Sequence, residues 1–280
     1  MREIHTDLIT AAIKDMCIEA NTCLNPDIEN AIRKSSETED NPLAKGILSD
    51  LIKNAEIARK EGIPICQDTG MAVVFLKIGQ DVHITGKNLS EAIDDGIRSG
   101  YRDGYLRKSV VADPIRRGNT EDNTPAILHT EIVPGENFEI TVAPNGFGSE
   151  NMSAVKMLKP SEGEEGVKQF VVETVKKAGG NPCPPIVVGV GIGGSFEKCA
   201  YLAKLALTRN IDSKNPDIYY ADMEDELLER INNLNIGPQG FGGKTTALGV
   251  NIETFPTHIA GMPVAVNISC HVTRHLTKII

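Results

Sequence analysis

The stretch Pro64-Ile65-Cys66-Gln67-Asp68-Thr69-Gly70 is followed directly by the apolar run Met71-Ala72-Val73-Val74-Phe75-Leu76. A thiol, an amide, a carboxylate and a hydroxyl occupy four consecutive residues, and a glycine separates them from a segment with strand character. A loop at the edge of a strand can aim several polar groups at one point while the strand holds them in place. Taken alone, the stretch is explained better as an ordinary polar turn with a buried cysteine than as a functional site. A functional interpretation therefore depends on the rest of the chain.

Composition limits the function classes that have to be considered. The 280 residues are 24% charged and 40% hydrophobic, which is typical of a soluble globular protein. A net charge of −9 and an aromatic content of 4%, without tryptophan, argue against a nucleic-acid partner. No stretch approaches the roughly 20 apolar residues of a membrane span, and the acidic N-terminus does not resemble a signal peptide. We therefore expect a cytoplasmic protein with no membrane partner.

Hydrophobic periodicity predicts an α+β fold: one unit over residues 1–280, with a mixed sheet, flanking helices and a helical N-terminal part over about 1–62. Asn88 and the pair Ser161 and Glu164 are expected to cap helices, and Pro134-Gly135-Glu136 to join a hairpin. The predicted helices cover 4–20, 27–35, 42–61, 89–106, 161–177, a segment after Ser195, and 219–233. The predicted strands cover 71–76, 81–84, 126–133, 137–143, 186–190, 246–252 and 264–269.

Two glycine-rich motifs suggest nucleotide binding. Gly189-Val190-Gly191-Ile192-Gly193-Gly194 satisfies the G-x-G-x-x-G pattern between a predicted strand and a predicted helix, so a dinucleotide-binding oxidoreductase is a remote alternative. No run of βα units surrounds it, which makes this the minority interpretation. Gly242-Gly243-Lys244-Thr245 is no Walker A motif, because Pro238 stands where that motif requires its first glycine.

The six cysteines divide into two groups by their context. Cys17 and Cys199 lie on the apolar stripes of predicted helices and are expected in the core, and Cys23 has no evident chemistry. Three others lie in polar, non-helical contexts beside strands, without the C-x-x-C spacing of a zinc site: Cys66, Cys183 and Cys270. Three thiolates are one short of the four that saturate a cubane iron–sulfur cluster, although spacing alone favours structural cysteines.

At these residues the chain resembles the class I iron–sulfur hydro-lyases, which comprise class I fumarase and L(+)-tartrate dehydratase. The matching segments run in the family's order over nearly the whole chain: Cys66-Gln67-Asp68-Thr69-Gly70, Asn119–Pro125, Gly146–Asn151, Cys183-Pro184-Pro185, Gln239-Gly240-Phe241-Gly242-Gly243-Lys244, and His258 through Cys270. The resemblance implies a class I fumarase α-type fold and a [4Fe–4S] cluster held by Cys66, Cys183 and Cys270, with the fourth iron binding substrate.

Further roles are implied by the same resemblance. Gln67 and Asp68 match substrate-side residues, and Arg107 matches an arginine that pairs with a substrate carboxylate. Gly148 matches a glycine whose backbone approaches the substrate, and His258, with Asp68, is a candidate proton donor. One departure concerns the segment before Gly148, where the family's usual Lys-Gly-Gly-Gly is replaced by Asn-Gly-Phe-Gly, so that a cation is lost.

The resemblance also implies a partner. The base that removes the C–H proton is expected on a β-type domain, as a threonine, and the chain ends shortly after Cys270 without such a domain. We therefore expect half of an active site, completed by a β subunit in a hetero-oligomer and acting on a four-carbon dicarboxylate. Reversible hydration of fumarate to malate is the main expectation, and L(+)-tartrate dehydration is the alternative.

Overall fold

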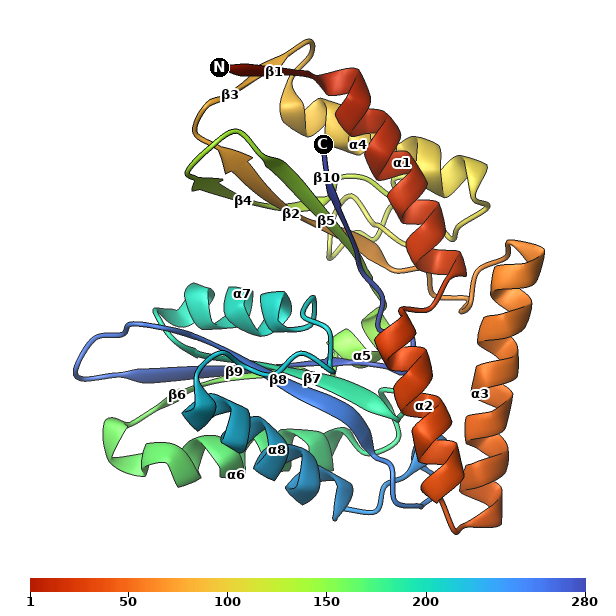
Figure 1. Cartoon of the computed structure of the whole chain (residues 1–280), viewed down its shortest axis with the longest axis vertical. Coiled ribbons are helices and arrows are strands. Elements are labelled where there is room, and N and C mark those ends of the chain that lie inside the picture. Colours follow the sequence, from red (N-terminus) through yellow and green to blue (C-terminus); the bar gives the residue numbers. More distant parts are fainter. The chain divides into compact units, whose positions relative to one another are not determined.

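The computed structural model describes all 280 residues and divides into two compact units. The first comprises Met1–Asn25, Ala55–Phe147 and Arg274–Ile280, and the second comprises Pro26–Asn54 and Gly148–Thr273. Each unit combines helices with a sheet, which confirms the α+β class (Figure 1). The helical segments within residues 1–62 are shared between the units. None of the helices combines the length and the apolar composition that crossing a membrane requires.

The first unit is built on a four-stranded sheet in the order β10-β5-β2-β4, with a separate parallel pair of β1 and β3. Helices α1 and α4 pack against each other, and α1 also contacts β5 (Figure 1). The core between them is apolar and fully buried, with Ile9, Ile13, Met16, Ile97 and Phe138 at its centre. The elements are β1 (Arg2–His5), α1 (Thr6–Thr22), β2 (Met71–Gly79), β3 (Val82–Thr85), α4 (Leu89–Asp103), β4 (Ile127–Val133), β5 (Phe138–Asn145) and β10 (Leu276–Ile279).

The predicted hairpin at Pro134-Gly135-Glu136 is wrong. Strand β2 lies between β4 and β5, parallel to the former and antiparallel to the latter, so the two predicted partners do not touch along their length. The end of β2 takes the hydrogen bonds that a hairpin would have used: the Gln80 N–H donates to the Val133 carbonyl, and the Gly79 N–H donates to the Asn137 carbonyl. The local turn signal was read correctly, but it could not reveal the inserted strand.

The helix predicted over 89–106 ends earlier, at Asp103, because Gly104 forms its C-cap. Asn88 caps its start as predicted, accepting from the N–H groups of Ser90 and Glu91. Tyr105, inside the predicted helix, is 92% exposed with a φ of 52°. Arg107 therefore lies in a loop rather than at a helix terminus. Similarly, the first helix begins only at Thr6, after a short strand.

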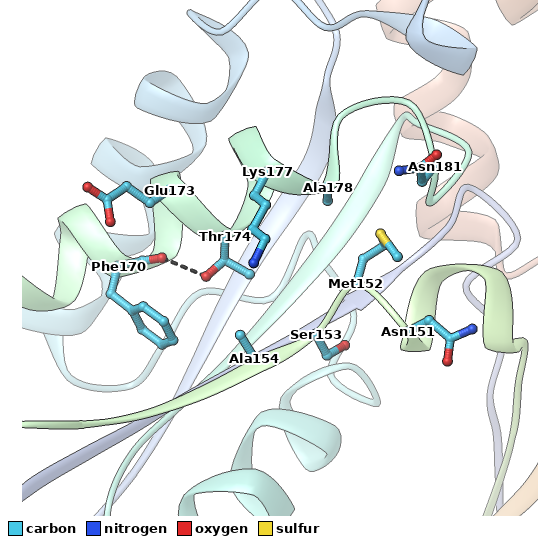
Figure 2. Close-up of a pocket in the computed structure, with 10 residues that line it drawn as sticks. All are labelled: Asn151, Met152, Ser153, Ala154, Phe170, Glu173, Thr174, Lys177, Ala178 and Asn181. Atoms are coloured by element: carbon cyan, nitrogen blue, oxygen red, sulfur yellow. Dashed lines mark hydrogen bonds between the residues drawn. The ribbon is translucent and has the colours of Figure 1, made fainter.

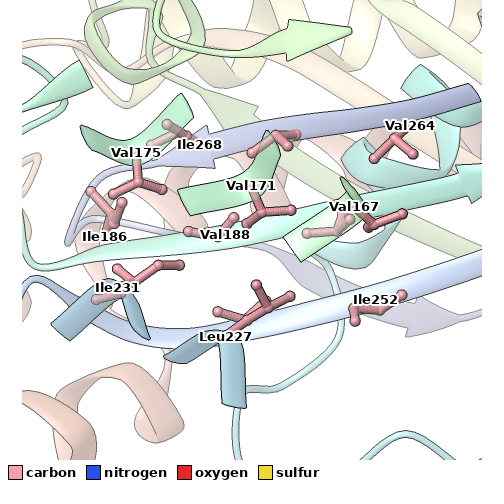
Figure 3. Close-up of a cluster of buried hydrophobic side chains, with 14 of the residues drawn as sticks. Val167, Val171, Val175, Ile186, Val188, Leu227, Ile231, Ile252, Val264 and Ile268 are labelled. Carbon is pink, nitrogen blue, oxygen red and sulfur yellow. The ribbon is translucent and has the colours of Figure 1, made fainter. Parts of the chain in front are cut away.

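The second unit has a four-stranded sheet in the order β6-β9-β7-β8. Figure 3 shows valines of α6 meeting isoleucines and valines of the strands, with Leu227 and Ile231 of α8 joining the same cluster. Helix α7 packs on β7 and β9. The elements are α2 (Pro26–Thr38), α3 (Pro42–Glu61, whose last turns belong to the first unit), α5 (Phe147–Glu150, whose first residue belongs to the first unit), β6 (Ala154–Leu158), η1 (Pro160–Glu162), α6 (Gly163–Ala178), β7 (Ile186–Gly193), α7 (Phe196–Ala206), α8 (Ile218–Asn232), η2 (Pro238–Gly240), β8 (Ala247–Phe255) and β9 (Met262–Ser269).

Two local predictions in this unit are corrected. The predicted capping box of Ser161 and Glu164 does not form before α6; instead, the Lys159 N–H donates to the Glu162 carboxylate at 2.7 Å across the short helix η1. Ser195 precedes α7 as predicted, but its hydroxyl donates to the Glu197 carboxylate instead of capping the helix.

The G-x-G-x-x-G glycines have a packing role. Gly189 and Gly191 lie inside β7, and a Cβ built on them would stand 2.1 Å from the Ala203 carbonyl oxygen and 2.0 Å from that of Cys199. A dinucleotide site needs its glycines in the turn after the strand, where they approach the phosphates. Here the first two allow helix α7 to lie closely on the sheet.

Candidate functional site

The loop Cys66–Gly70 joins α3 to β2 in the first unit. The Cys66 thiol is half-buried, and the Asp68 N–H points at its sulfur from 3.4 Å. The Asp68 carboxylate is itself oriented by two backbone donors: Oδ1 accepts from the Gly70 N–H at 3.0 Å, and Oδ2 accepts from the Phe147 N–H at 2.9 Å. Gln67 lies between them and is exposed, with its side-chain oxygen 3.3 Å from the Cys66 sulfur. The thiol, the amide and the carboxylate are thus presented together.

Three buried side chains donate hydrogen bonds to backbone carbonyls of this loop. Arg274 Nη2 donates to the Asp68 carbonyl at 2.6 Å, and the Tyr101 hydroxyl lies 2.9 Å from the Thr69 carbonyl and 3.0 Å from that of Gly70. Asn123 Nδ2 also donates to the Gly70 carbonyl, at 3.1 Å. Three successive carbonyls are therefore satisfied away from water, which fixes the direction in which the loop faces.

Arg107 is brought next to the same loop. Its N–H donates to the Thr69 hydroxyl oxygen at 2.8 Å, and that hydroxyl lies 3.2 Å from its carbonyl. Thr69 is only 2% exposed, so this double contact is well protected. The side chain of Arg107 is exposed. Its guanidinium can therefore move toward a ligand at the loop while its backbone stays fixed.

In the second unit, Cys183 and Cys270 are brought to the same end of the sheet. Cys183 precedes β7, Cys270 follows β9, and these two strands are antiparallel with Val187 opposite Ser269. The ring of His271, the residue after Cys270, lies with Nδ1 3.0 Å from the Cys183 carbonyl, so that nitrogen donates. Cys183, between two prolines, has a φ of 56°, in the left-handed region. Two flanking prolines did not prevent this turn.

Gln239 reinforces the turn at Cys183. Its side-chain Nε2 and its backbone N–H both donate to the Pro184 carbonyl, each at 2.7 Å. Gln239 belongs to one of the segments singled out in the sequence, but nothing there assigned it a contact.

Gly148 and His258 differ in their placement. Gly148 lies in α5, exposed, and a Cβ built on it would meet nothing within 4 Å. The second unit therefore does not require glycine at this position.

His258 lies in the exposed loop between β8 and β9, at the end of the sheet opposite Cys183 and Cys270. An eight-residue strand is about 23 Å long, so the second unit does not bring His258 together with its two loop cysteines.

Glu150, two residues after Gly148, has a largely buried set of partners within the second unit. Its carboxylate accepts from Lys204 at 2.5 Å and from Asn267 Nδ2 at 2.8 Å. Burial lowers the pKa of Lys204 against the opposing effect of Glu150. These side chains border a cavity of about 250 Å³ whose lining also includes four alanines. On the other face of β6, a larger pocket of about 480 Å³ opens beside α6, with the Lys177 ammonium pointing into it (Figure 2).

The cysteines differ in a way that matters for metal binding. Cys17 and Cys199 are fully buried on helices, as predicted, and burial raises the pKa of both thiols, that of Cys17 to about 12. A thiol that stays protonated is a poor metal ligand. Cys66 and Cys270 are half-buried and Cys183 is exposed, all outside helices and strands, and these three fit a cluster by donor chemistry. Cys66 belongs to the first unit and the other two to the second, and no three potential ligands gather within the structure as described.

Sequence reasoning missed the supporting residues Tyr101, Asn123, Arg274 and His271. One signal was available for the first of them. A tyrosine on the apolar face of a helix buries a hydroxyl that needs a partner, and here that partner is the site loop. The others lie in segments without periodicity, and their contacts reach as far as 206 residues along the chain.

Comparison with known proteins gives one consistent picture. A sequence model of the family described as fumarate hydratase (Fumerase) matches residues 10–278. A Methanocaldococcus jannaschii protein, provisionally named L(+)-tartrate dehydratase subunit alpha, is 42% identical over 276 residues, or 96% of each chain. The L(+)-tartrate dehydratase subunit alpha of Escherichia coli (strain K12) is 31% identical over 275 residues, covering 97% of this chain and 90% of that one.

Proposed function

Because the chain belongs to the fumarate hydratase family of hydro-lyases, we propose that it is the α-type chain of an enzyme that removes water from a four-carbon hydroxy-dicarboxylate. L(+)-tartrate is the substrate we favour, since the named relatives that cover nearly the whole chain are tartrate dehydratase α subunits. This choice reverses the expectation from sequence, which put fumarate first. Fumarate hydration remains the second candidate, supported by the description of the family.

We further propose that Cys66, Cys183 and Cys270 hold a [4Fe–4S] cluster. The observation that supports it best is the division of the thiols into two buried cysteines with raised pKa values and three on loops with polar surroundings. A bound cluster would supply a Lewis acid for the departing hydroxyl.

The residues around Cys66 have roles that follow from their chemistry. Arg107 would grip a substrate carboxylate through two parallel N–H donors, for which a guanidinium is well shaped. Gln67 can donate to a substrate hydroxyl or carboxylate. Asp68, when protonated, would give its proton to the leaving hydroxyl, with its orientation held by the Gly70 and Phe147 N–H groups. We assign this step to Asp68 rather than His258, because the second unit places His258 at the end of its sheet opposite Cys183 and Cys270.

Elimination of water also requires a base for the proton on the adjacent carbon. No residue of this chain is assigned to that step, and we propose that a β subunit provides the base, as the names of the α-subunit relatives support. The chain and its β partner would then form a hetero-oligomer with one composite active site.

The test is an anaerobic assay. The chain alone, reconstituted with iron and sulfide, is expected to gain a brown chromophore but to turn over nothing. Addition of the β subunit should give activity that is higher on L(+)-tartrate than on fumarate or malate. Full activity of the lone chain would contradict the composite site. A preference for fumarate would reject tartrate as the substrate, and absence of iron would reject the cluster.

A further inference from the structure

Arg274 is an unusual arginine, because its charge is buried without an acidic partner. The residue is 5% exposed and lies in the first unit, four residues after Cys270 in the sequence. Its side chain makes a single hydrogen bond, from Nη2 to the Asp68 carbonyl at 2.6 Å, and its buried Nε has no hydrogen-bond partner in the protein. A buried guanidinium is costly unless it is paired, so a purely structural filler at this position would more simply be apolar.

Arg274 belongs to a set of buried donors that bind the carbonyls of the Cys66–Gly70 loop. The loop above it turns three consecutive carbonyl oxygens inward, those of Asp68, Thr69 and Gly70. Tyr101 and Asn123 are the neutral donors of the set, and burial raises the pKa of the Tyr101 hydroxyl so that it remains a donor. Arg274 is the only charged donor of the set. A charge-assisted hydrogen bond is roughly twice as strong as a neutral one, which makes this the firmest hold on the loop.

The hydrogen bond from Arg274 also affects the directions of the N–H and the carboxylate of Asp68. The carbonyl of Asp68 accepts from Arg274, and the N–H of Asp68 points at the Cys66 sulfur. The carboxylate of Asp68 accepts from the Gly70 N–H. If the carbonyl were released, the residue could rotate, and both the N–H and the carboxylate would lose their directions. Hydrogen bonds to a ligand sulfur also tune iron–sulfur centres.

We infer that Arg274 is a positioning residue for the Cys66–Gly70 loop, holding the thiol of Cys66 and the carboxylate of Asp68 in their working directions. Its effect on the loop is independent of any cofactor. Its effect on cluster retention rests on the function proposed above.

The test uses hydrogen exchange in the full-length chain, which reads the loop without a cofactor. Arg274→Met should speed exchange of the amides of Gly70 and Arg107 about tenfold or more, while the amides of β7 in the second unit keep their rates. Arg274→Lys keeps a charge but loses the planar fork, and should give a smaller increase at the same amides. Ile13→Val, a truncation in the core of the first unit, is the control for destabilisation alone.

Two results would overturn the inference: unchanged loop exchange in Arg274→Met, or an increase spread evenly over the first unit as in the Ile13→Val control. If Arg274→Met does not fold, the lysine variant decides by the same two criteria.

A second measurement separates this inference from the proposed function. After anaerobic reconstitution, the visible absorbance of Arg274→Met should decay several-fold faster in air than that of the unsubstituted chain. Equal decay would reject the effect on cluster retention. If the unsubstituted chain binds no iron, the proposed cluster fails, and the exchange experiment still decides whether Arg274 holds the loop.

Discussion

The two cysteine-bearing turns, one in each unit, are held by different means. The Cys66–Gly70 loop rests on donors that are buried: Tyr101 and Asn123 are fully inaccessible, and Arg274 nearly so. The turn at Cys183 rests on Gln239 and His271, both only half-buried. Both turns therefore use side chains to fix backbone carbonyls, but only the first does so with buried donors.

The difference in burial of the donors determines how much stability the protein should lose when a donor is removed. A buried carbonyl that loses its partner bears the full desolvation penalty, whereas at a half-exposed position water can take the place of the lost group. Substitutions beneath the first loop should therefore lower the stability of the first unit as well as its function. Substitutions beside the second turn should affect its local geometry and leave the fold nearly unchanged.

Replacing the thiols should have the largest effect on cluster binding and activity, and this effect should be the same at both turns. Cys66→Ser and Cys183→Ser are each expected to abolish the brown chromophore and to reduce activity with the β subunit by more than about a thousandfold, because a hydroxyl is a poor ligand for iron in a thiolate site. Iron content, visible absorbance and anaerobic turnover provide the measurement. Cys23→Ser is the matched control and should retain all three.

A chromophore that survives in Cys183→Ser but not in Cys66→Ser would limit the cluster site to the first turn. Survival in both variants would reject the proposed ligand set.

Asn123→Ala should cause the largest loss of stability. The side chain accepts from the N–H groups of Ser109 and Val110 and donates to the Gly70 carbonyl, and it is fully buried. Its φ of 64° is also tolerated better by asparagine than by alanine. We expect a loss of about 2–4 kcal/mol in the free energy of unfolding, measured by urea denaturation. Asn119→Ala, an exposed position in the same segment, should cost less than about 1 kcal/mol.

The sequence was sufficient to predict the elements whose ends carry a chemical signal. Helix α3 occupies 42–61 as predicted, because Pro42 suits a first turn and Gly62, with a φ of 64°, stops the helix. Strands β1, β6 and β10, each four or five residues long, were not predicted. The place of β2 between β4 and β5 depends on long-range pairing, which no local pattern encodes.

The same division applies to the candidate site. The contrast between helical Cys17 and Cys199 and the loop cysteines could be read from sequence, because apolar periodicity reports burial. The donors beneath the first loop could not be read, since a hydrogen bond from Arg274 to Asp68 spans 206 residues. Roles for Gln67, Asp68, Arg107, Gly148 and His258 rested on family resemblance, and they stay predictions until their variants are assayed.

The segment that carries Asn123 also gives a prediction for pH dependence. Although burial opposes it, hydrogen bonds from Thr124 and from Arg98 lower the pKa of Asp122 to about 2. A carboxylate with a lowered pKa stabilises the folded state above its unfolded value of about 4 and loses this contribution as the pH falls toward 2. Asp122→Asn should therefore cost about 1–2 kcal/mol at pH 7 and clearly less at pH 3. An equal cost at both pH values would contradict this origin.

The smallest effect is expected at the second turn, where Gln239→Ala removes one of two donors to the Pro184 carbonyl. The backbone N–H of residue 239 remains and still donates to that oxygen, and the Gln239 side chain is half-exposed, although Pro184 is buried. The residue has a φ of 53°, a strain that glutamine and alanine share, so the substitution adds none. The loss in unfolding free energy should stay below about 1 kcal/mol. A loss above about 2 kcal/mol would mean that water cannot replace this donor, and that the Cys183 turn is held as firmly as the Cys66 loop.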